Sequence, residues 1–472
     1  MNFHGAKTEA EKLEALLRSA KPGSSGNPFT AYGAADGKLM LGWANPPSWE
    51  EISLYMETVF GFTPLQKAKE IIFCSTGGWI HAVRMASELF EGTNKQKLFA
   101  LDSLSSSSFH KTINELDPAE DCVVAGISAS MNTLETRLNM EAFAAAFSRS
   151  GKAAHFLTLS DSAPAASWDR EECFGLAIRG TSDIPALFAA PSSAAFLLPL
   201  LLHAGYAQAK KSWELFLEGH TYWQKKMIEA MLGLPAPFPA FLYFVFPPQA
   251  GDSLKLYLLQ MLRQCLVQKS THYSPKILAG TGEAPPGFYP VYLPWPSSPV
   301  HGVSGMLLAH SVAFGVAGMG YQNRLSFVTH EKVNEYKKRI PEFLLSEQQL
   351  NALSHFPQFE ELENVLFSVF EKRPEVRFIE IVLYGDEEED KRCALEQQLR
   401  AAFRQDIRTW FGTAWNHHSY QAAGDRLDTH VIVIPFISEG AVLPERARIL
   451  HAVAFATHYS LGECSTLFTG VC

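Results

Sequence analysis

The chain has 472 residues, of which 47% are hydrophobic and 19% are charged. This composition is typical of a folded globular protein and excludes disorder as the main state. The length corresponds to about three domains. The formal net charge is -9 and the basic residues are scattered, so a nucleic-acid or anionic-membrane surface is not expected.

The cysteines and the apolar stretches narrow down the class of protein further. The seven cysteines occupy positions 74, 122, 173, 265, 393, 464 and 472. Because their number is odd and no CxxC occurs, we expect neither a disulfide framework nor a cysteine zinc site. The first 17 residues carry acids throughout, and the apolar stretches at 194–202 and 238–246 are shorter than the roughly 20 residues that span a bilayer. We therefore expect a cytoplasmic protein without membrane or metal partners.

The first part of the chain predicts an α/β domain. Residues 8–20 form an amphipathic helical pattern, and a Gly/Ser/Pro loop follows. Short apolar runs, which predict strands, lie at 70–74, 97–101, 121–127 and 154–158. Helical patterns lie between and after them at 80–90, 107–116 and 134–148. Strands without polar alternation, joined by helices of this length, predict a parallel sheet covered on both faces.

The pattern restarts after a mostly helical stretch at 193–232. Predicted strands of a second α/β domain lie at 241–246, 276–278 and 291–293, with helices at 254–267, 301–319 and 333–345. The remainder predicts strands at 378–384, 407–413 and 431–435, with helices at 391–403 and 445–459. Periodicity leaves open whether this last part is a third domain or an extension of the second sheet.

Two loops rich in small polar residues and glycine are candidates for ligand binding. Residues 75–78 (STGG) and 128–133 (SASMNT) each follow a predicted strand and precede a helix. Helix N-termini offer free N–H groups and a partial positive charge, so such loops hold anions. Ligands of open parallel sheets bind at the carboxyl ends of the strands, where both loops lie. The alternative is plain helix capping by Ser, Thr and Asn.

The second loop and its continuation, SASMNTLET, resemble the phosphate-binding loop of glucose-6-phosphate isomerases, Ser-Lys-Thr/Ser-x-Thr-Thr-x-Glu-Thr. Gly77-Gly78-Trp79 is similar to the family's Gly-Gly-Ser loop, and residues 261–283 resemble the stretch that ends in Gly-Glu-Pro. Residues 377–434 resemble the phosphoglucose isomerase half of bifunctional transaldolase/phosphoglucose isomerase proteins. The resemblance extends from about residue 45 to 440.

This resemblance implies an α/β fold of two SIS-type (sugar-isomerase) parallel-sheet αβα sandwich domains with a C-terminal α/β extension. The expected segments are an N-terminal helix and loop (1–45), a first domain (46–205), a helical connector (206–235), a second domain (236–345) and the extension (346–472).

The resemblance further implies an aldose–ketose isomerase of the glucose 6-phosphate/fructose 6-phosphate type, acting through a cis-enediol without a cofactor. Glu283 matches the catalytic base and Lys337 the active-site lysine; His301 lies near the position of the ring-opening histidine, and His330 stands where the family has glutamine. The phosphate would be held by Gly77, Gly78, Ser128, Ser130, Asn132 and Thr133. The residues alone allow another interpretation of Glu283, a solvated loop acid before two prolines.

Three positions depart from the family pattern. Ala129 replaces a lysine of the phosphate loop, Trp79 replaces a serine, and Pro191 aligns with the arginine of a Gly-Gly-Arg motif. Losing such transition-state donors typically lowers the rate a hundredfold or more. The alternative function is therefore a catalytically inactive sugar-phosphate-binding or regulatory partner of a carbohydrate-pathway enzyme. The family is commonly dimeric, so a homodimer is expected.

Overall fold

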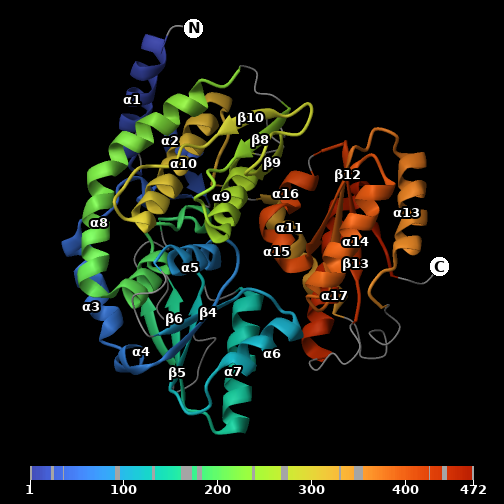
Figure 1. Ribbon diagram of the computed structural model, residues 1–472, viewed down its shortest axis with the longest axis horizontal. Coiled ribbons are helices and arrows are strands. Elements are labelled where there is room, and N and C mark those ends of the chain that lie inside the picture. The colour runs from blue at the N-terminus through green and yellow to red at the C-terminus, as the bar shows by residue number, and fades with distance from the viewer. Residues whose placement is uncertain are drawn as a thin grey trace. The chain divides into compact units, whose positions relative to one another are not determined.

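The computed structural model describes residues 3–22, 26–35, 37–90, 96–129, 133–160, 173–177, 183–235, 240–266, 275–328, 331–344, 355–424, 426–437 and 444–469. The chain divides into two compact units. The first unit comprises Met1–Asp102 and Leu116–Thr329, and the second comprises Ser103–Glu115 and His330–Cys472. The second unit thus includes a short stretch whose neighbours on both sides belong to the first. Figure 1 shows the elements in chain order.

Five parallel strands form the first sheet of the first unit. They are β3 (Glu70–Cys74), β4 (Lys97–Leu101), β5 (Cys122–Ile127), β6 (Ala154–Ser160) and β7 (Cys173–Ala177). Their spatial order is β4-β3-β5-β6-β7, so the first strand lies between the second and the third. Every residue of β3 and β5 is buried, as expected for strands covered on both faces. Helices α5 (Gly77–Leu89) and α7 (Leu134–Ser150) lie beside this sheet (Figure 1).

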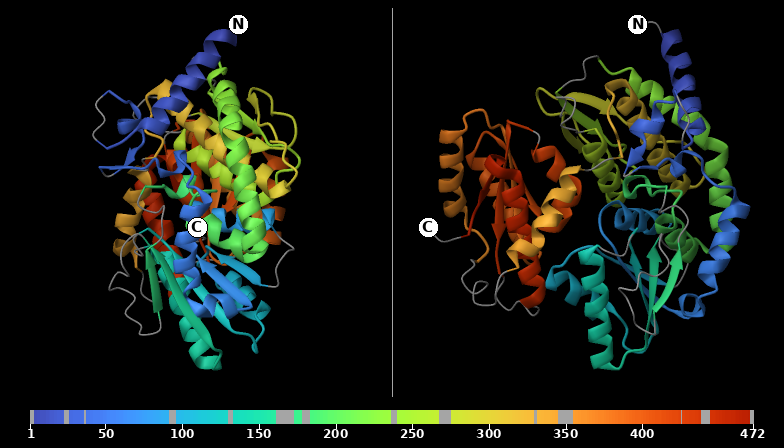
Figure 2. Two further views of the ribbon diagram at one scale, coloured as in Figure 1. Left: turned by 90° about the vertical axis from the view of Figure 1, so that its left-hand side faces the viewer. Right: turned by 180° about the vertical axis from the view of Figure 1, so that it is seen from behind.

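The first unit also contains the helices α1 (Phe3–Ser19), α3 (Trp49–Phe60), α8 (Ala194–Leu232) and α10 (His301–Asn323). Helix α10 is buried from residue 302 to 320, whereas the other three are partly exposed. The longest, α8, has 39 residues and is seen along its length in Figure 2. A Cβ at Gly305 of α10 would lie 2.6 Å from the Leu89 side chain, so glycine lets α10 approach α5 closely.

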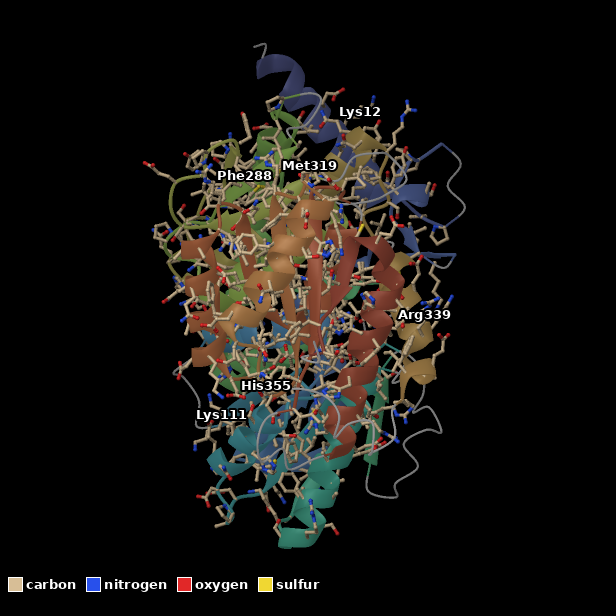
Figure 3. The ribbon with its side chains drawn as sticks, turned by 90° about the vertical axis from the view of Figure 1, so that its right-hand side faces the viewer. Lys12, Lys111, Phe288, Met319, Arg339 and His355 are labelled. Atoms are coloured by element: carbon tan, nitrogen blue, oxygen red, sulfur yellow. The ribbon has the colours of Figure 1, made fainter. Side chains whose placement is uncertain are left out.

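Helix α10 is long and apolar enough to cross a membrane by length and composition alone, yet its apolar window is 100% buried within the protein. Met319, labelled in Figure 3, has no exposed surface. A helix that is apolar all round and enclosed in this way is typical of the core of a large unit.

A second, three-stranded parallel sheet completes the first unit. Its strands β8 (Phe241–Val245), β9 (Lys276–Gly280) and β10 (Tyr289–Tyr292) have the order β10-β8-β9. Helix α9 (Asp252–Cys265) follows β8 and packs against both β9 and α5. The short elements of this unit are α2 (Phe29–Tyr32), β1 (Ala34–Ala35), β2 (Lys38–Leu39), η1 (Gly42–Ala44), α4 (Thr63–Lys67) and η2 (Ala186–Phe188).

The second unit has a four-stranded parallel sheet of its own. Strands β11 (Phe378–Tyr384), β12 (Asp406–Phe411), β13 (Thr429–Pro435) and β14 (Ser465–Leu467) have the order β12-β11-β13-β14. Its helices and 3-10 turns are α6 (Ser106–Glu115), α11 (Glu331–Arg339), η4 (Ile340–Phe343), α13 (Phe359–Lys372), α14 (Glu389–Ala402), α15 (Gly412–His418), α16 (Tyr420–Gly424), α17 (Pro444–Leu461) and η5 (Gly462–Cys464).

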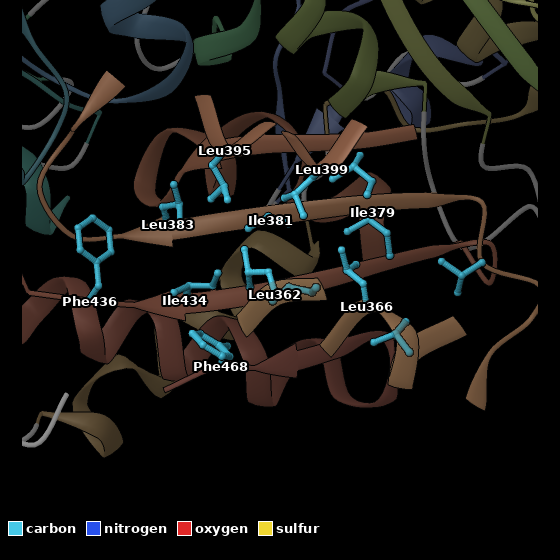
Figure 4. Packing of buried hydrophobic residues seen from close by; sticks show 14 residues of the cluster. Leu362, Leu366, Ile379, Ile381, Leu383, Leu395, Leu399, Ile434, Phe436 and Phe468 are labelled. Atoms are coloured by element: carbon cyan, nitrogen blue, oxygen red, sulfur yellow. The ribbon is translucent and has the colours of Figure 1, made fainter. Parts of the chain in front are cut away.

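The central strand β11 shows why this sheet is covered on both faces. Ile379, Ile381 and Leu383 belong to a buried cluster with side chains of α13 and α14 (Figure 4). Two residues of the other face carry polar groups: the carboxylate of Glu380 accepts from the Trp415 indole, and the Tyr384 hydroxyl bonds to α15 and α17. Because successive strand residues face opposite sides, one face of β11 is apolar and the other includes these polar contacts.

The α/β class predicted from the sequence is confirmed, with parallel sheets packed against helices. The last part of the chain is not an extension of the second sheet, because it forms a separate four-stranded sheet. The units divide the chain at 329/330 rather than at the expected 345/346, and no division falls at 205/206. The shared helices explain the second difference, since α5 packs against both α8 and α9.

Candidate functional site

The two predicted loops meet at one edge of the first sheet. β3 and β5 are parallel neighbours with Cys74 opposite Gly126, so both end at the same edge. The Ser75 hydroxyl donates to the carbonyl oxygen of Ile127 at 2.7 Å and joins the two loop starts. In the strand order described above, the chain turns to opposite sides after β3 and β5, which is the position where open α/β sheets bind ligands.

The first loop leads directly into α5. Gly77 has φ +60°, a conformation that glycine adopts without strain. A Cβ at Gly78 would lie 2.0 Å from the carbonyl oxygen of Ala186, so the backbone of η2 rests against this helix start. Trp79 is buried in the first helical turn. The absence of a side chain at Gly78 therefore leaves room for the backbone of η2.

The second loop begins with hydroxyl groups that contact one another. The Oγ atom of Ser128 lies 3.0 Å from Oγ1 of Thr133 across the loop. The Ser160 hydroxyl, at the end of β6, donates to the carbonyl oxygen of Ala129 at 3.0 Å. Ser128 and Thr133 are thus in contact, whereas Ser130 and Asn132 lie outside the described residues.

The helix starts that follow these two loops lack side-chain caps. The N-cap residues of α5 and α7, Thr76 and Thr133, make no side-chain capping hydrogen bond. By contrast, Ser48 at the start of α3 forms a capping box. Uncapped starts keep N–H groups and the positive end of the helix dipole available, which favours an anion.

A cation near this edge is already paired. Arg84 of α5 binds Asp102, directly after β4, with its two terminal nitrogens at 2.8 and 2.7 Å from the carboxylate oxygens. Burial acts to raise the pKa of Asp102, but the Arg84 guanidinium outweighs it and holds this pKa below its usual value. Sequence reasoning missed this pair, because no motif joins positions 84 and 102.

The predicted catalytic residues occupy separate places. Glu283 follows β9 in the first unit and is exposed. His301 begins α10, is also exposed, and lies with its ring centroid 5.1 Å from that of Trp295. Lys337 is exposed on α11 of the second unit, and His330 lies outside the described residues. Among the described residues no hydrogen bond joins Glu283 to His301. An exposed carboxylate keeps its hydration, so this conformation lacks the water-excluded surroundings that favour proton abstraction.

Comparisons with known proteins bear on the fold. No protein-family model and no curated protein matches the chain significantly. A solved structure of a hypothetical protein from Thermus thermophilus is 14% identical, covers 73% of this chain and 96% of its own, and superposes with a TM-score of 0.52. Tagatose-6-phosphate ketose/aldose isomerase from Escherichia coli is 13% identical over 60% of this chain and 91% of its own, with a TM-score of 0.37. The likeness to the Thermus thermophilus structure shows a shared α/β fold. The TM-score of the second superposition is too low to support any further conclusion.

Proposed function

We propose that this chain binds a sugar phosphate and interconverts its aldose and ketose forms, as the resemblance to glucose-6-phosphate isomerases implies. The observation that carries the proposal is the meeting of two loops, each ahead of an uncapped helix start, at the switch point of the first sheet. The phosphate would lie against the starts of α5 and α7, beside Ser128 and Thr133. Neutral donors and helix dipoles would stabilise it there in place of the family's lysine.

The chemistry requires a base that moves a proton between C2 and C1 of the open-chain sugar. In the proposed mechanism the Glu283 carboxylate removes the C2 proton and an enediolate forms. The resulting carboxyl group, whose proton can exchange with solvent, then protonates C1, or C2 in the reverse direction. His301 would stabilise the developing oxygen charge. Because Glu283 is exposed, the proposal requires its loop between β9 and β10 to close over the ligand. Glucose 6-phosphate is the first substrate to test, and a sugar with another anionic group is the next.

The second candidate function is sugar-phosphate binding without catalysis. The exposure of Glu283 and Lys337, together with Ala129 and Pro191 where the family has cations, favours this alternative. Such a protein would keep the anion site at the first sheet and would sense the ligand or assist another enzyme.

Proton exchange separates the two functions. The unaltered chain and Glu283→Gln are incubated with glucose 6-phosphate in D2O, and deuterium at C2 is followed by NMR. Glu57→Gln, which alters an exposed glutamate of α3, is the matched control. Exchange that Glu283→Gln abolishes and Glu57→Gln retains would support the isomerase. Thermal stabilisation by glucose 6-phosphate without exchange would support the binding protein, and neither effect would refute both.

A further inference from the structure

Two buried hydroxyl groups at the start of α8 have no hydrogen-bond partner. Ser192 and Ser193 directly precede the helix and expose 4% and 0% of their surface. The Oγ atom of each is enclosed and unpartnered. Ser193 is the N-cap residue, yet its side chain does not cap the helix. Serines before an apolar run predict a helix start, but only the structure reveals that their hydroxyls are unused.

Two backbone N–H groups beside these hydroxyls are hydrogen-bonded. The N–H of Ala190 donates to the Tyr257 hydroxyl at 3.0 Å, and the N–H of Ser193 donates to the carbonyl oxygen of Ala189 at 2.8 Å. Burying an unpaired hydroxyl costs stability, whereas alanine at the same place would not. Two adjacent unpaired hydroxyls at one helix start, beside backbone N–H groups that are paired, are candidates for groups that a ligand satisfies.

The turn before α8 connects these serines to the proposed anion site. Ala186 rests against Gly78 at the start of α5. The N–H of Ala189 bonds to the carbonyl oxygen of Ala186, and that of Ser193 bonds to Ala189. Two hydrogen-bonded turns therefore separate Ser193 from Ala186, the residue that packs against the start of α5.

We propose that Ser192 and Ser193 donate hydrogen bonds to hydroxyl or carbonyl oxygens of the sugar part of a sugar phosphate. This inference rests on the proposed function. The phosphate occupies the starts of α5 and α7, and the sugar extends to the start of α8. Because both hydroxyls are enclosed, binding moves the turn at 186–189 away from Gly78. Neutral hydroxyl donors suit the uncharged oxygens of a sugar, whereas cations suit its phosphate.

The test uses the full-length double variant Ser192→Ala/Ser193→Ala, with Ser212→Ala as a matched control. Ser212 lies in the interior of the same helix, is completely buried, and also has an unpartnered hydroxyl. Thermal unfolding and calorimetric binding are measured with glucose 6-phosphate and with inorganic phosphate. Both variants are expected to unfold at a higher temperature than the unaltered chain. Only the double variant is expected to bind glucose 6-phosphate more weakly, by about tenfold or more for two lost hydrogen bonds, with its phosphate affinity unchanged.

Each other outcome has a distinct meaning. Unchanged glucose 6-phosphate affinity in the double variant would refute the assignment, because the hydroxyls would then have no ligand. An equal loss for both probes would also refute it and place the serines on the phosphate. If the unaltered chain binds neither probe, the proposed function fails and this inference falls with it.

Discussion

His430 of β13 should make the stability of the second unit sensitive to acid. Its side chain is 3% exposed. A terminal nitrogen of Arg373 lies 3.1 Å from its Nδ1, and the Thr466 hydroxyl lies 2.9 Å from its Nε2. Because a guanidinium can only donate, Nδ1 must accept and Nε2 must carry the proton. The imidazole is therefore neutral, and a second proton would break the bond to Arg373 and oppose its charge.

The size of the effect follows from the pKa. Burial, then the charge of Arg373 and then that of His458, lowers the pKa of His430 from 6.5 to about 4. Between these two pH values the unfolded chain binds a proton that the folded chain does not, so the free energy of unfolding falls as the pH falls. One pH unit corresponds to about 1.4 kcal/mol. The expected loss is about 2 kcal/mol at pH 5 and about 3 kcal/mol at pH 4, relative to pH 7.5.

The assay compares the unaltered chain with His430→Asn, whose amide oxygen can still accept from Arg373. Urea unfolding at pH 7.5 and pH 5 is followed by hydrogen exchange in peptides from β13, which report on the second unit. The variant should lose about 2 kcal/mol less than the unaltered chain between the two pH values. His355→Asn, at an exposed histidine of the same unit, controls for the loss of a histidine. Equal losses in the unaltered chain and His430→Asn would show that this imidazole does not carry the acid sensitivity.

Two further contacts predict measurable losses of stability. The Lys152 ammonium lies 3.2 Å from the Glu70 carboxylate, and both side chains are buried. Lys152→Met should lower the free energy of unfolding by about 3–5 kcal/mol, because it removes the cation paired with a buried carboxylate. In a double-mutant cycle measured by denaturation, adding Glu70→Gln should restore part of this loss. The Asp386 carboxylate accepts a hydrogen bond from the N–H of Ser106 at 2.7 Å, at the start of α6. Asp386→Ala should lower the free energy of unfolding by about 1 kcal/mol and speed hydrogen exchange in α6. A similar change in the control Asp390→Ala, at an exposed aspartate, would argue against capping.

The strands could be predicted from the sequence because they are buried on both faces. Apolar runs such as 70–74 and 378–384 coincide with β3 and β11 to the residue. Elements with mixed patterns were missed: no strand was predicted at β7 or β14, and no helix at α13. The predicted strand at 407–413 ends earlier, at Phe411, because Gly412 begins α15 at once. The two-unit division was not predictable, since no local pattern shows that α6 packs with a sheet encoded more than 260 residues later.

For the candidate site, too, some features could be predicted from the sequence and others could not. Loops at the ends of parallel strands are a consequence of topology, so the closeness of the two loop starts, at Ser75 and Ser128, could be predicted from chain order. Side-chain surroundings could not. The exposure of Glu283, the pairing of Arg84 with Asp102 and the unpartnered hydroxyls at the start of α8 depend on contacts between distant parts of the chain. The motifs therefore locate an edge of a sheet without defining its chemistry.

In each of the three parallel sheets, the first strand in the chain lies between the second and the third, so the carboxyl edges of these sheets can be compared. At the second sheet, Glu88 of α5 places its carboxylate on the N–H of Ser253 at 2.8 Å, so an acid of the chain already occupies the start of α9. At the sheet of the second unit, the loop after β11 is engaged by α6 through Asp386, and the ring of Phe436 packs against Gly385. A carboxylate held at a helix start repels a second anion and uses its donors. At the first sheet, α5 has no acidic residue in its first turn, whereas α7 carries the buried Glu135 there. The start of α5 is therefore where a phosphate meets less competition from the chain itself.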